Sequence, residues 1–102
     1  MRLKRGVAAV ATLVATSAFA EGDVEYGEYL SSECVACHSP RGDDKGIPSI
    51  VGWEPEAFVA VMKSYQLKER LNPTMQVIAG SLDDEQTAAL AAYFSTLSPQ
   101  KN

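Results

Sequence analysis

The segment Cys34-Val35-Ala36-Cys37-His38 constrains this chain more than any other, because it contains both cysteines and the single histidine of the sequence. Thiol and imidazole groups at this spacing suit four kinds of site: a disulfide, part of a metal site, a thiol redox centre, or the attachment point of a larger group. Each of these requires a different fold around it. The rest of the sequence therefore has to decide among them.

The N-terminal 20 residues have the pattern of a secretory signal peptide. Three basic residues precede an uncharged, Ala-rich run, which ends at the small-x-small sequence Ala18-Phe19-Ala20. This run is shorter than the ~20 residues that a membrane-spanning helix needs. We therefore expect residues 1–20 to be cleaved and residues 21–102 to form one periplasmic domain that does not insert into a membrane.

The mature chain would be small and acidic. Removal of 20 of the 102 residues leaves 82, with six basic side chains against 13 acidic ones, a balance of about −7. This charge disfavours nucleic acid and favours a partner that presents Lys and Arg. A domain of this size removes only about 60 to 65% of its unfolded surface from water, so its core needs a further component such as a cofactor.

The hydrophobic pattern predicts an all-α domain with three main helices and long linking segments. Asp23 is placed to cap a first helix over residues 24–33, in which Gly27 leaves room for another helix to approach. Residues 39–46 read as an exposed loop, and residues 47–52 as an extended buried segment. Residues 68–80 are expected to be irregular, because Asn72-Pro73 breaks a helix.

The other two helices have clear start signals. Pro55 suits the first turn of a helix that runs to about Leu67, with a stripe of apolar residues at helical spacing. Ser81 and Asp84 resemble a capping box at the start of the last helix, which Pro99 ends. The two buried stripes consist of Phe58, Val61, Met62 and Tyr65 in the former and Leu90, Tyr93, Phe94 and Leu97 in the latter.

Cys-x-x-Cys-His is the attachment signal for c-type haem. Both thiols would add to the haem vinyl groups as thioethers, and His38 would become the proximal ligand of the iron. A structural zinc site needs four ligands, and this chain has only three Cys and His side chains. A thioredoxin-like site needs a βαβ setting, which the helical pattern lacks. A simple disulfide remains an alternative, although it leaves the small core unexplained.

The second axial ligand of the iron is expected to be a methionine, since a thioether favours ferrous iron in electron-carrying cytochromes. Two methionines remain in the mature chain. Met62 falls in the apolar stripe of the second helix, where a methionine is typically part of the core. Met75 follows Asn72-Pro73 in chain that can aim its side chain inward. We therefore expect Met75 as the sixth ligand, with Met62 or an open site as alternatives.

The order of these motifs resembles a class I, monohaem c-type cytochrome over residues 23–97. The resemblance implies that the first and last helices cross near Gly27, Leu30 and Tyr93. It also implies that the carbonyl oxygen of Pro48 accepts a hydrogen bond from the second ring nitrogen of His38. Such a bond fixes the ring and raises the basicity of the ligand. A turn constraint is the alternative role for Pro48.

Within this class, three segments are similar to the cytochrome subunit of flavocytochrome c sulfide dehydrogenase: residues 34–58, 62–75 and 78–97. The resemblance implies an electron carrier in sulfur oxidation, not an enzyme by itself. Its electrons would come from a flavoprotein subunit and pass to another cytochrome or an oxidase. The chain differs from common versions in having Ser39 after the histidine and a short loop before Ile47. A free-standing shuttle, a peroxidase-like enzyme and a gas sensor remain alternative functions.

The remaining candidate residues are less specific. Trp53 suits a place beside a haem propionate or a partner, and equally a packing role at the edge of the core. Lys68 and Arg70 are candidate partners of the propionates, or simply solvated. The acidic residues of segment 21–33 form either a docking face or an ordinary solvated helix surface.

Overall fold

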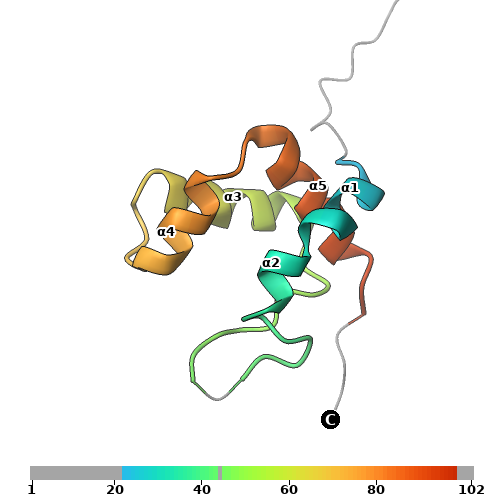
Figure 1. Cartoon of the computed structure of the whole chain (residues 1–102), viewed down its shortest axis with the longest axis horizontal. Helices are drawn as coiled ribbons and strands as arrows, with labels where there is room; N and C mark the ends of the chain where they lie inside the picture. Colours follow the sequence, from blue (N-terminus) through green and yellow to red (C-terminus); the bar gives the residue numbers. More distant parts are fainter. Residues whose placement is uncertain (1–21, 44, 99–102) are drawn as a thin grey trace, which may run out of the picture.

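The computed structural model describes residues 22–43 and 45–98. The expected signal peptide, Glu21 and Pro99 lie outside these ranges. The described chain contains five helices and no strand, which confirms the predicted all-α class. These are α1 (Val24–Leu30), α2 (Ser32–Val35), α3 (Pro55–Gln66), α4 (Pro73–Gly80) and α5 (Asp84–Ser95) (Figure 1). No helix within residues 22–43 and 45–98 is long and apolar enough to cross a membrane.

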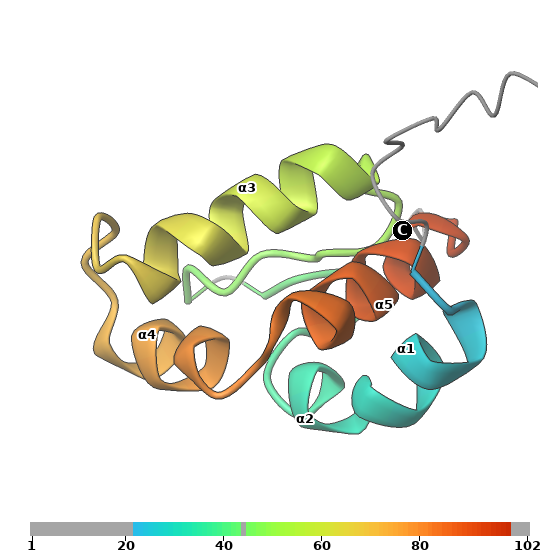
Figure 2. The same cartoon turned by 90° about the horizontal axis from the view of Figure 1, so that it is seen from above.

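Helices α1 and α5 cross at close range, as the resemblance implied. A Cβ atom on Gly27 would lie 2.0 Å from the carbonyl oxygen of Ala89 and 2.7 Å from the Cβ of Tyr93. Only a glycine allows this approach, because any side chain at this position would overlap the α5 backbone. The crossing brings the first and last described helices together, at the opposite end of the molecule from α4 (Figure 2).

The first predicted helix is interrupted where the sequence pattern predicts continuity. Asp23 caps α1, because its carboxylate accepts hydrogen bonds from the backbone N–H groups of Glu25 and Tyr26. The helix then ends at Leu30, and α2 begins at Ser32. At the junction, the Ser31 hydroxyl donates to the carbonyl oxygen of Glu28 at 2.6 Å, a side-chain bond that competes with the helical pattern.

Helix α4 corrects the prediction that residues 68–80 lack a helix. Asn72 caps this helix by accepting a hydrogen bond from the backbone N–H of Met75, at 3.1 Å. Pro73 occupies the first turn, where its missing N–H and fixed φ angle are compatible with a helix. The pair Asn72-Pro73 therefore starts a helix here.

The predictions for the two longest helices are largely correct. Helix α3 starts at Pro55 and buries Phe58 and Met62. The cap of helix α5 lies two residues later than predicted: its capping box is formed by Asp83 and Gln86, not by Ser81 and Asp84. The core joins α3, α4 and α5 to the segment before α3. Its buried apolar residues are Ile50, Val51, Phe58, Met62, Ala79, Leu90, Ala91 and Phe94.

Candidate functional site

Helix α2 and the turn that follows it position the Cys-x-x-Cys-His segment. Cys34 lies within α2 and packs against the core cluster, half-buried, whereas Cys37 is exposed. The backbone N–H groups of Cys37 and His38 both donate to the carbonyl oxygen of Cys34, at 3.1 and 2.8 Å. This turn keeps the three side chains of the motif together. The two thiols are free, and no disulfide joins them.

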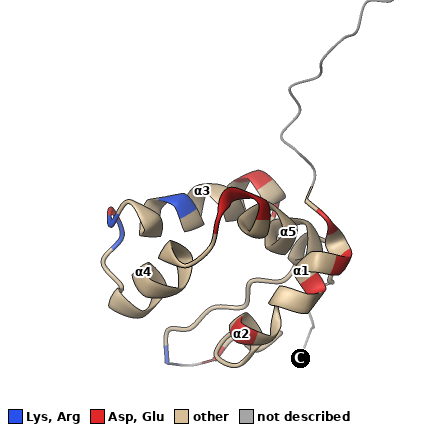
Figure 3. Ribbon diagram, turned by 45° about the horizontal axis from the view of Figure 1, so that its top comes forward, with Lys and Arg blue, Asp and Glu red and all other residues tan. Residues whose placement is uncertain are grey.

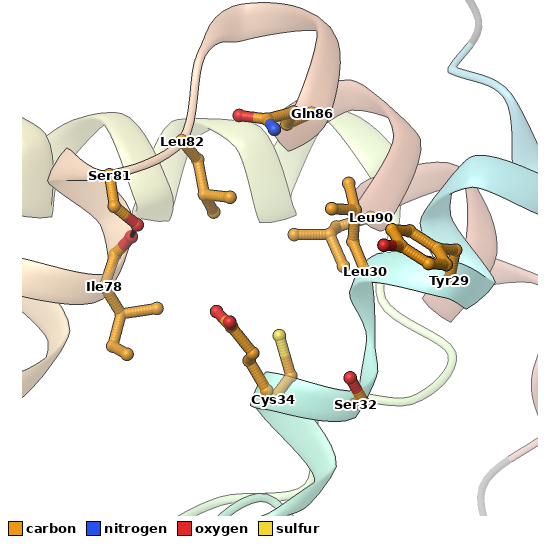
Figure 4. Close-up of a pocket in the computed structure, with 10 residues that line it drawn as sticks. Tyr29, Leu30, Ser32, Cys34, Ile78, Ser81, Leu82, Gln86 and Leu90 are labelled. Carbon is orange, nitrogen blue, oxygen red and sulfur yellow. Dashed lines mark hydrogen bonds between the residues drawn. The ribbon is translucent and has the colours of Figure 1, made fainter.

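A pocket of about 370 Å³ lies beside Cys34. Its walls come from α1, α2, α4, α5 and the turn before α5, and Figure 4 shows the Cys34 thiol pointing into the space between α2 and α4. The aliphatic side chains on its walls are those of Leu30, Ile78, Leu82 and Leu90. The other lining residues besides Cys34 are polar: Tyr29, Ser32, Glu33, Ser81 and Gln86. The pocket therefore offers one apolar wall to a group attached through the Cys34 sulfur.

Burial holds Cys34 in its thiol form. Loss of water around the group, together with the negative charge of neighbouring Glu33, raises the pKa of Cys34 from 9.0 to about 11. A thiol with a raised pKa is a poor metal ligand and a poor redox nucleophile, because both roles require the thiolate. Among residues 22–43 and 45–98, no three His, Cys, Asp or Glu side chains are grouped so that they could hold a metal ion.

The imidazole of His38 is oriented by the segment that follows the loop. Its Nδ1 atom lies 2.7 Å from the carbonyl oxygen of Pro48, the contact that the resemblance implies. Because a carbonyl oxygen can only accept, Nδ1 is the donor, and in the neutral imidazole the lone pair is then on Nε2. The chain around Pro48 is itself anchored, since Ser49 Oγ donates to the carbonyl oxygen of Pro40 at 2.8 Å. Nε2 is therefore the ring atom that can bind a metal.

The two methionines have different environments. Met62 is 5% exposed, on the buried face of α3. Met75 is half-buried in the first turn of α4 and packs against the edge of the core cluster. Neither Met75 nor His38 lines the pocket beside Cys34. Met75 thus lies at the edge of the core, while Met62 belongs to its interior.

The less specific candidates are engaged in packing or lie in solvent. Trp53 is half-buried and meets the ring of Phe58 edge-on, with 6.4 Å between ring centroids. The Arg70 guanidinium lies 5.9 Å from the centre of the Tyr65 ring. Lys68 is exposed and has a positive φ of 60°, which is uncommon for a residue with a side chain.

Charged residues are unevenly distributed over the described surface. Figure 3 shows acidic residues on α1 and at the start of α5, and basic residues near the end of α3 and in the loop after it. Within the described part of the chain, an ion pair joins the two regions, between Lys63 and Asp84 at 3.5 Å. Of the acidic residues in segment 21–33, Asp23 has a structural role as the α1 cap, and Glu21 lies outside the described residues.

Two residues that sequence reasoning overlooked fix the position of α4. Asn72 caps its N-terminus, and the Asn-Pro pair was the signal that could have revealed this cap. The Gln66 side-chain amide donates to the carbonyl oxygen of Ala79 at 3.1 Å and to that of Leu82 at 3.4 Å. No sequence pattern points to Gln66, because its role depends on where α4 packs.

Comparison with known proteins identifies the family. No family model matches the chain. Cytochrome c-553 of Helicobacter pylori is 31% identical over 98 residues, which cover 93% of this chain and 99% of that protein. Cytochrome c-554(548) of Halomonas halodenitrificans is 31% identical over 80 residues, which cover 74% of this chain and 96% of that protein. The chain belongs to the c-type cytochromes.

A third c-type cytochrome matches over a smaller part of its length. Cytochrome c4 of Thiocapsa roseopersicina is 33% identical over 78 residues, which cover 74% of this chain and 40% of that protein. The cofactor of a c-type cytochrome is covalently bound haem c, and its role is electron transfer between redox partners. The Cys-x-x-Cys-His spacing, the aliphatic side chains beside Cys34 and the oriented imidazole of His38 fit this cofactor.

Proposed function

We propose that this c-type cytochrome is a periplasmic one-electron carrier whose haem is attached through Cys34 and Cys37 and ligated by His38 and Met75. The observation that carries the proposal is the 2.7 Å contact between His38 Nδ1 and the Pro48 carbonyl oxygen. In the neutral imidazole this bond leaves the lone pair on Nε2 and would make that atom a stronger electron donor to iron.

The protein residues bind, orient and shield the cofactor. Haem, when bound, supplies the one-electron change between ferric and ferrous iron. Cys34 and Cys37 would fix one porphyrin edge, and Leu30, Leu82 and Leu90 would exclude water from its face. Met75 would supply a thioether ligand, which favours ferrous iron and would keep other ligands from the metal. A site with both protein ligands in place would suit electron transfer better than substrate turnover.

The ligand assignment is tested by the optical spectrum and by carbon monoxide binding. The native protein should have the mass of the processed chain plus one haem, and its reduced form should bind carbon monoxide slowly. Met75→Ala should remove the far-red absorption of the iron–sulfur bond, lower the reduction potential and allow rapid binding. Rapid binding to the unaltered protein would instead favour a gas sensor or a peroxidase-like enzyme. If the native protein has only the mass of the processed chain, the disulfide alternative for Cys34 and Cys37 is favoured.

The proposed electron donor is the flavoprotein subunit of a sulfide dehydrogenase, and the acceptor is a further cytochrome or an oxidase. The support is the similarity of segments 34–58, 62–75 and 78–97 to the cytochrome subunit of that enzyme. The test is purification of the native protein from the periplasm. A flavin-bearing partner in a fixed ratio would support this assignment. N-terminal sequencing of the same material should give Glu21, if residues 1–20 are the signal peptide.

A free-standing shuttle in a respiratory or photosynthetic chain is the second candidate. Two relatives, the cytochromes c-553 and c-554(548), match this chain over 99% and 96% of their own length, so each of them is about as long as the matched segment. The acidic surface of α1 and of the start of α5 would suit transient partners that present Lys and Arg. Purification of the cytochrome alone, together with electron transfer that slows steeply as salt rises, would favour the shuttle.

A further inference from the structure

Helix α4 carries Met75 but buries little apolar surface of its own. Ala79 is its only buried residue, while Val77 is 73% exposed on the outer face. Met75 and Ile78 are half-buried. With so few apolar contacts, the position of this helix depends on its polar contacts more than those of α3 or α5 do.

Side-chain hydrogen bonds hold both ends of α4. At its start, Asn72 accepts from the backbone N–H of Met75 at 3.1 Å. At its end, the Gln66 amide bridges the carbonyl oxygens of Ala79 and Leu82, at 3.1 and 3.4 Å. The Asn72 cap acts within one segment of chain. The Gln66 bridge, in contrast, ties α4 to a different helix, because Gln66 is the last residue of α3.

The Gln66 bridge is well placed to control Met75. Helix α3 is itself fixed in the core, where Phe58 and Met62 are 4% and 5% exposed. Met75 and Ala79 are four residues apart and therefore lie on the same face of α4. A donor that holds the Ala79 carbonyl against α3 consequently fixes the distance of the Met75 side chain from the core.

We propose that Gln66 is a positioning residue that holds α4 against α3 and thereby controls how often Met75 leaves the haem iron. The inference rests on the proposed function, since it requires Met75 as the axial ligand. Loss of the Gln66 donor would let the end of α4 move away and take the thioether with it. The chain as a whole would stay folded, because α1, α3 and α5 do not need this contact.

The decisive variant is Gln66→Glu in the haem-loaded protein, measured by the rate at which imidazole binds to ferric iron. The ionised carboxylate has the same shape as the amide but cannot donate, and it faces two carbonyl oxygens. At neutral pH we expect imidazole to bind about tenfold faster than in the unaltered protein. As the pH falls and the introduced carboxylate gains a proton, it regains a donor, so the rate should return toward that of the unaltered protein.

Two further variants separate this role from simple packing. Gln66→Ala should bind imidazole faster at every pH, without the acid recovery. Gln76→Ala is the matched control, because Gln76 also donates from its amide to a carbonyl oxygen, that of Arg70 at 2.9 Å, on the exposed side of α4. Its imidazole rate should change less than twofold. A Gln76 effect as large as that of Gln66 would overturn the proposal.

The outcomes also distinguish this inference from the proposed function. If Met75→Ala leaves the far-red iron–sulfur absorption intact, the ligand assignment itself fails. If Met75→Ala removes that absorption but both Gln66 variants bind imidazole at the normal rate, only the role of Gln66 is overturned. Hydrogen exchange of the unaltered holoprotein tests the same point without a variant. Amides of α4 that exchange no faster than those of α5 would contradict a separate opening of α4.

Discussion

Gly27 and Ala89 face each other so closely that a methyl group on Gly27 would lie 2.0 Å from the Ala89 carbonyl oxygen. The atom in the way belongs to the backbone of α5, so no side-chain rotation can relieve the overlap. Helices α1 and α5 would have to move apart, and the buried residues at the crossing would lose contact. The packing of the two helices therefore depends on the absence of a single Cβ atom.

Gly27→Ala is expected to destabilise the protein by about 1 to 3 kcal/mol, the usual cost of overpacking. Denaturant unfolding followed by circular dichroism measures this change. Gly80→Ala is the matched control, because nothing lies within 4 Å of a Cβ at that helical position. The control should be neutral or stabilising by up to about 1 kcal/mol. Equal effects of the two changes would contradict a close crossing at Gly27.

Met62→Ala should loosen the core and leave the axial bond intact. Removal of a buried methionine side chain typically costs about 2 to 5 kcal/mol, and Met62 is 5% exposed. The free energy of unfolding and the far-red absorption are the two measurements. Met75→Ala should show the opposite pattern, with a large spectral change. If Met62→Ala abolishes the iron–sulfur absorption and Met75→Ala does not, then Met62, and not Met75, is the axial ligand.

Asp83→Ala should cost about 1 kcal/mol, because it removes the capping box of α5. Its carboxylate accepts from the backbone N–H of Gln86 at 2.8 Å. Asp84→Ala removes an equal charge from the next residue, whose ion pair with Lys63 is largely exposed, and should cost less. Thermal unfolding of both variants gives the comparison. If Asp84→Ala lowers the thermal stability more than Asp83→Ala does, the charge at the start of α5 stabilises the helix more than the cap.

The raised pKa of Cys34 predicts unequal thiol reactivity in the haem-free chain. Between pH 8 and 10 Cys34 should stay a thiol and be alkylated more slowly than exposed Cys37. Because the folded pKa is about 11 and the ordinary value is 9.0, the free energy of unfolding should fall as the pH rises from about 9 to about 11. The haem-free fold should thus weaken above pH 9. Mass spectrometry after timed alkylation checks the first point, and urea should abolish the difference.

Equal alkylation rates in a chain that still shows helical circular dichroism would contradict the burial of Cys34. The haem-loaded protein provides the control for the stability effect. Once Cys34 is a thioether it has no proton to lose, so this contribution to alkaline destabilisation should disappear.

Much of the fold could be predicted from the sequence because its signals are local. The start of α3 follows from Pro55 and the α1 cap follows from Asp23, whereas the crossing of α1 with α5 was implied by the resemblance and not by Gly27 alone. The interruption at Ser31 could not be predicted, since the apolar pattern continues through it and the same serine bond to a carbonyl three residues back occurs at Ser64 within α3 without ending that helix. Helix α4 was missed because Asn72-Pro73 is both a helix-breaking pair and a good cap followed by a good first residue.

The candidate site divides in the same way. Cys34, Cys37 and His38 are adjacent in sequence, so their proximity needs no knowledge of the fold. The His38–Pro48 contact spans ten residues and came from resemblance, not from pattern. Gln66 could not be found at all, because its partners lie 13 and 16 residues further along the chain. Polar contacts between helices leave no periodic mark in a sequence.

The pairing of α1 with α5 also sets the order in which the protein can be made. A hydrogen bond from Gln86 to the Tyr26 hydroxyl joins residues 60 positions apart, and Gly27 has no packing partner until α5 exists. Segment 24–30 is therefore synthesised long before α5, the helix against which it packs. During that interval Leu90 of α5 is not yet beside Cys34, so the thiol that is half-buried in the fold is as open as exposed Cys37.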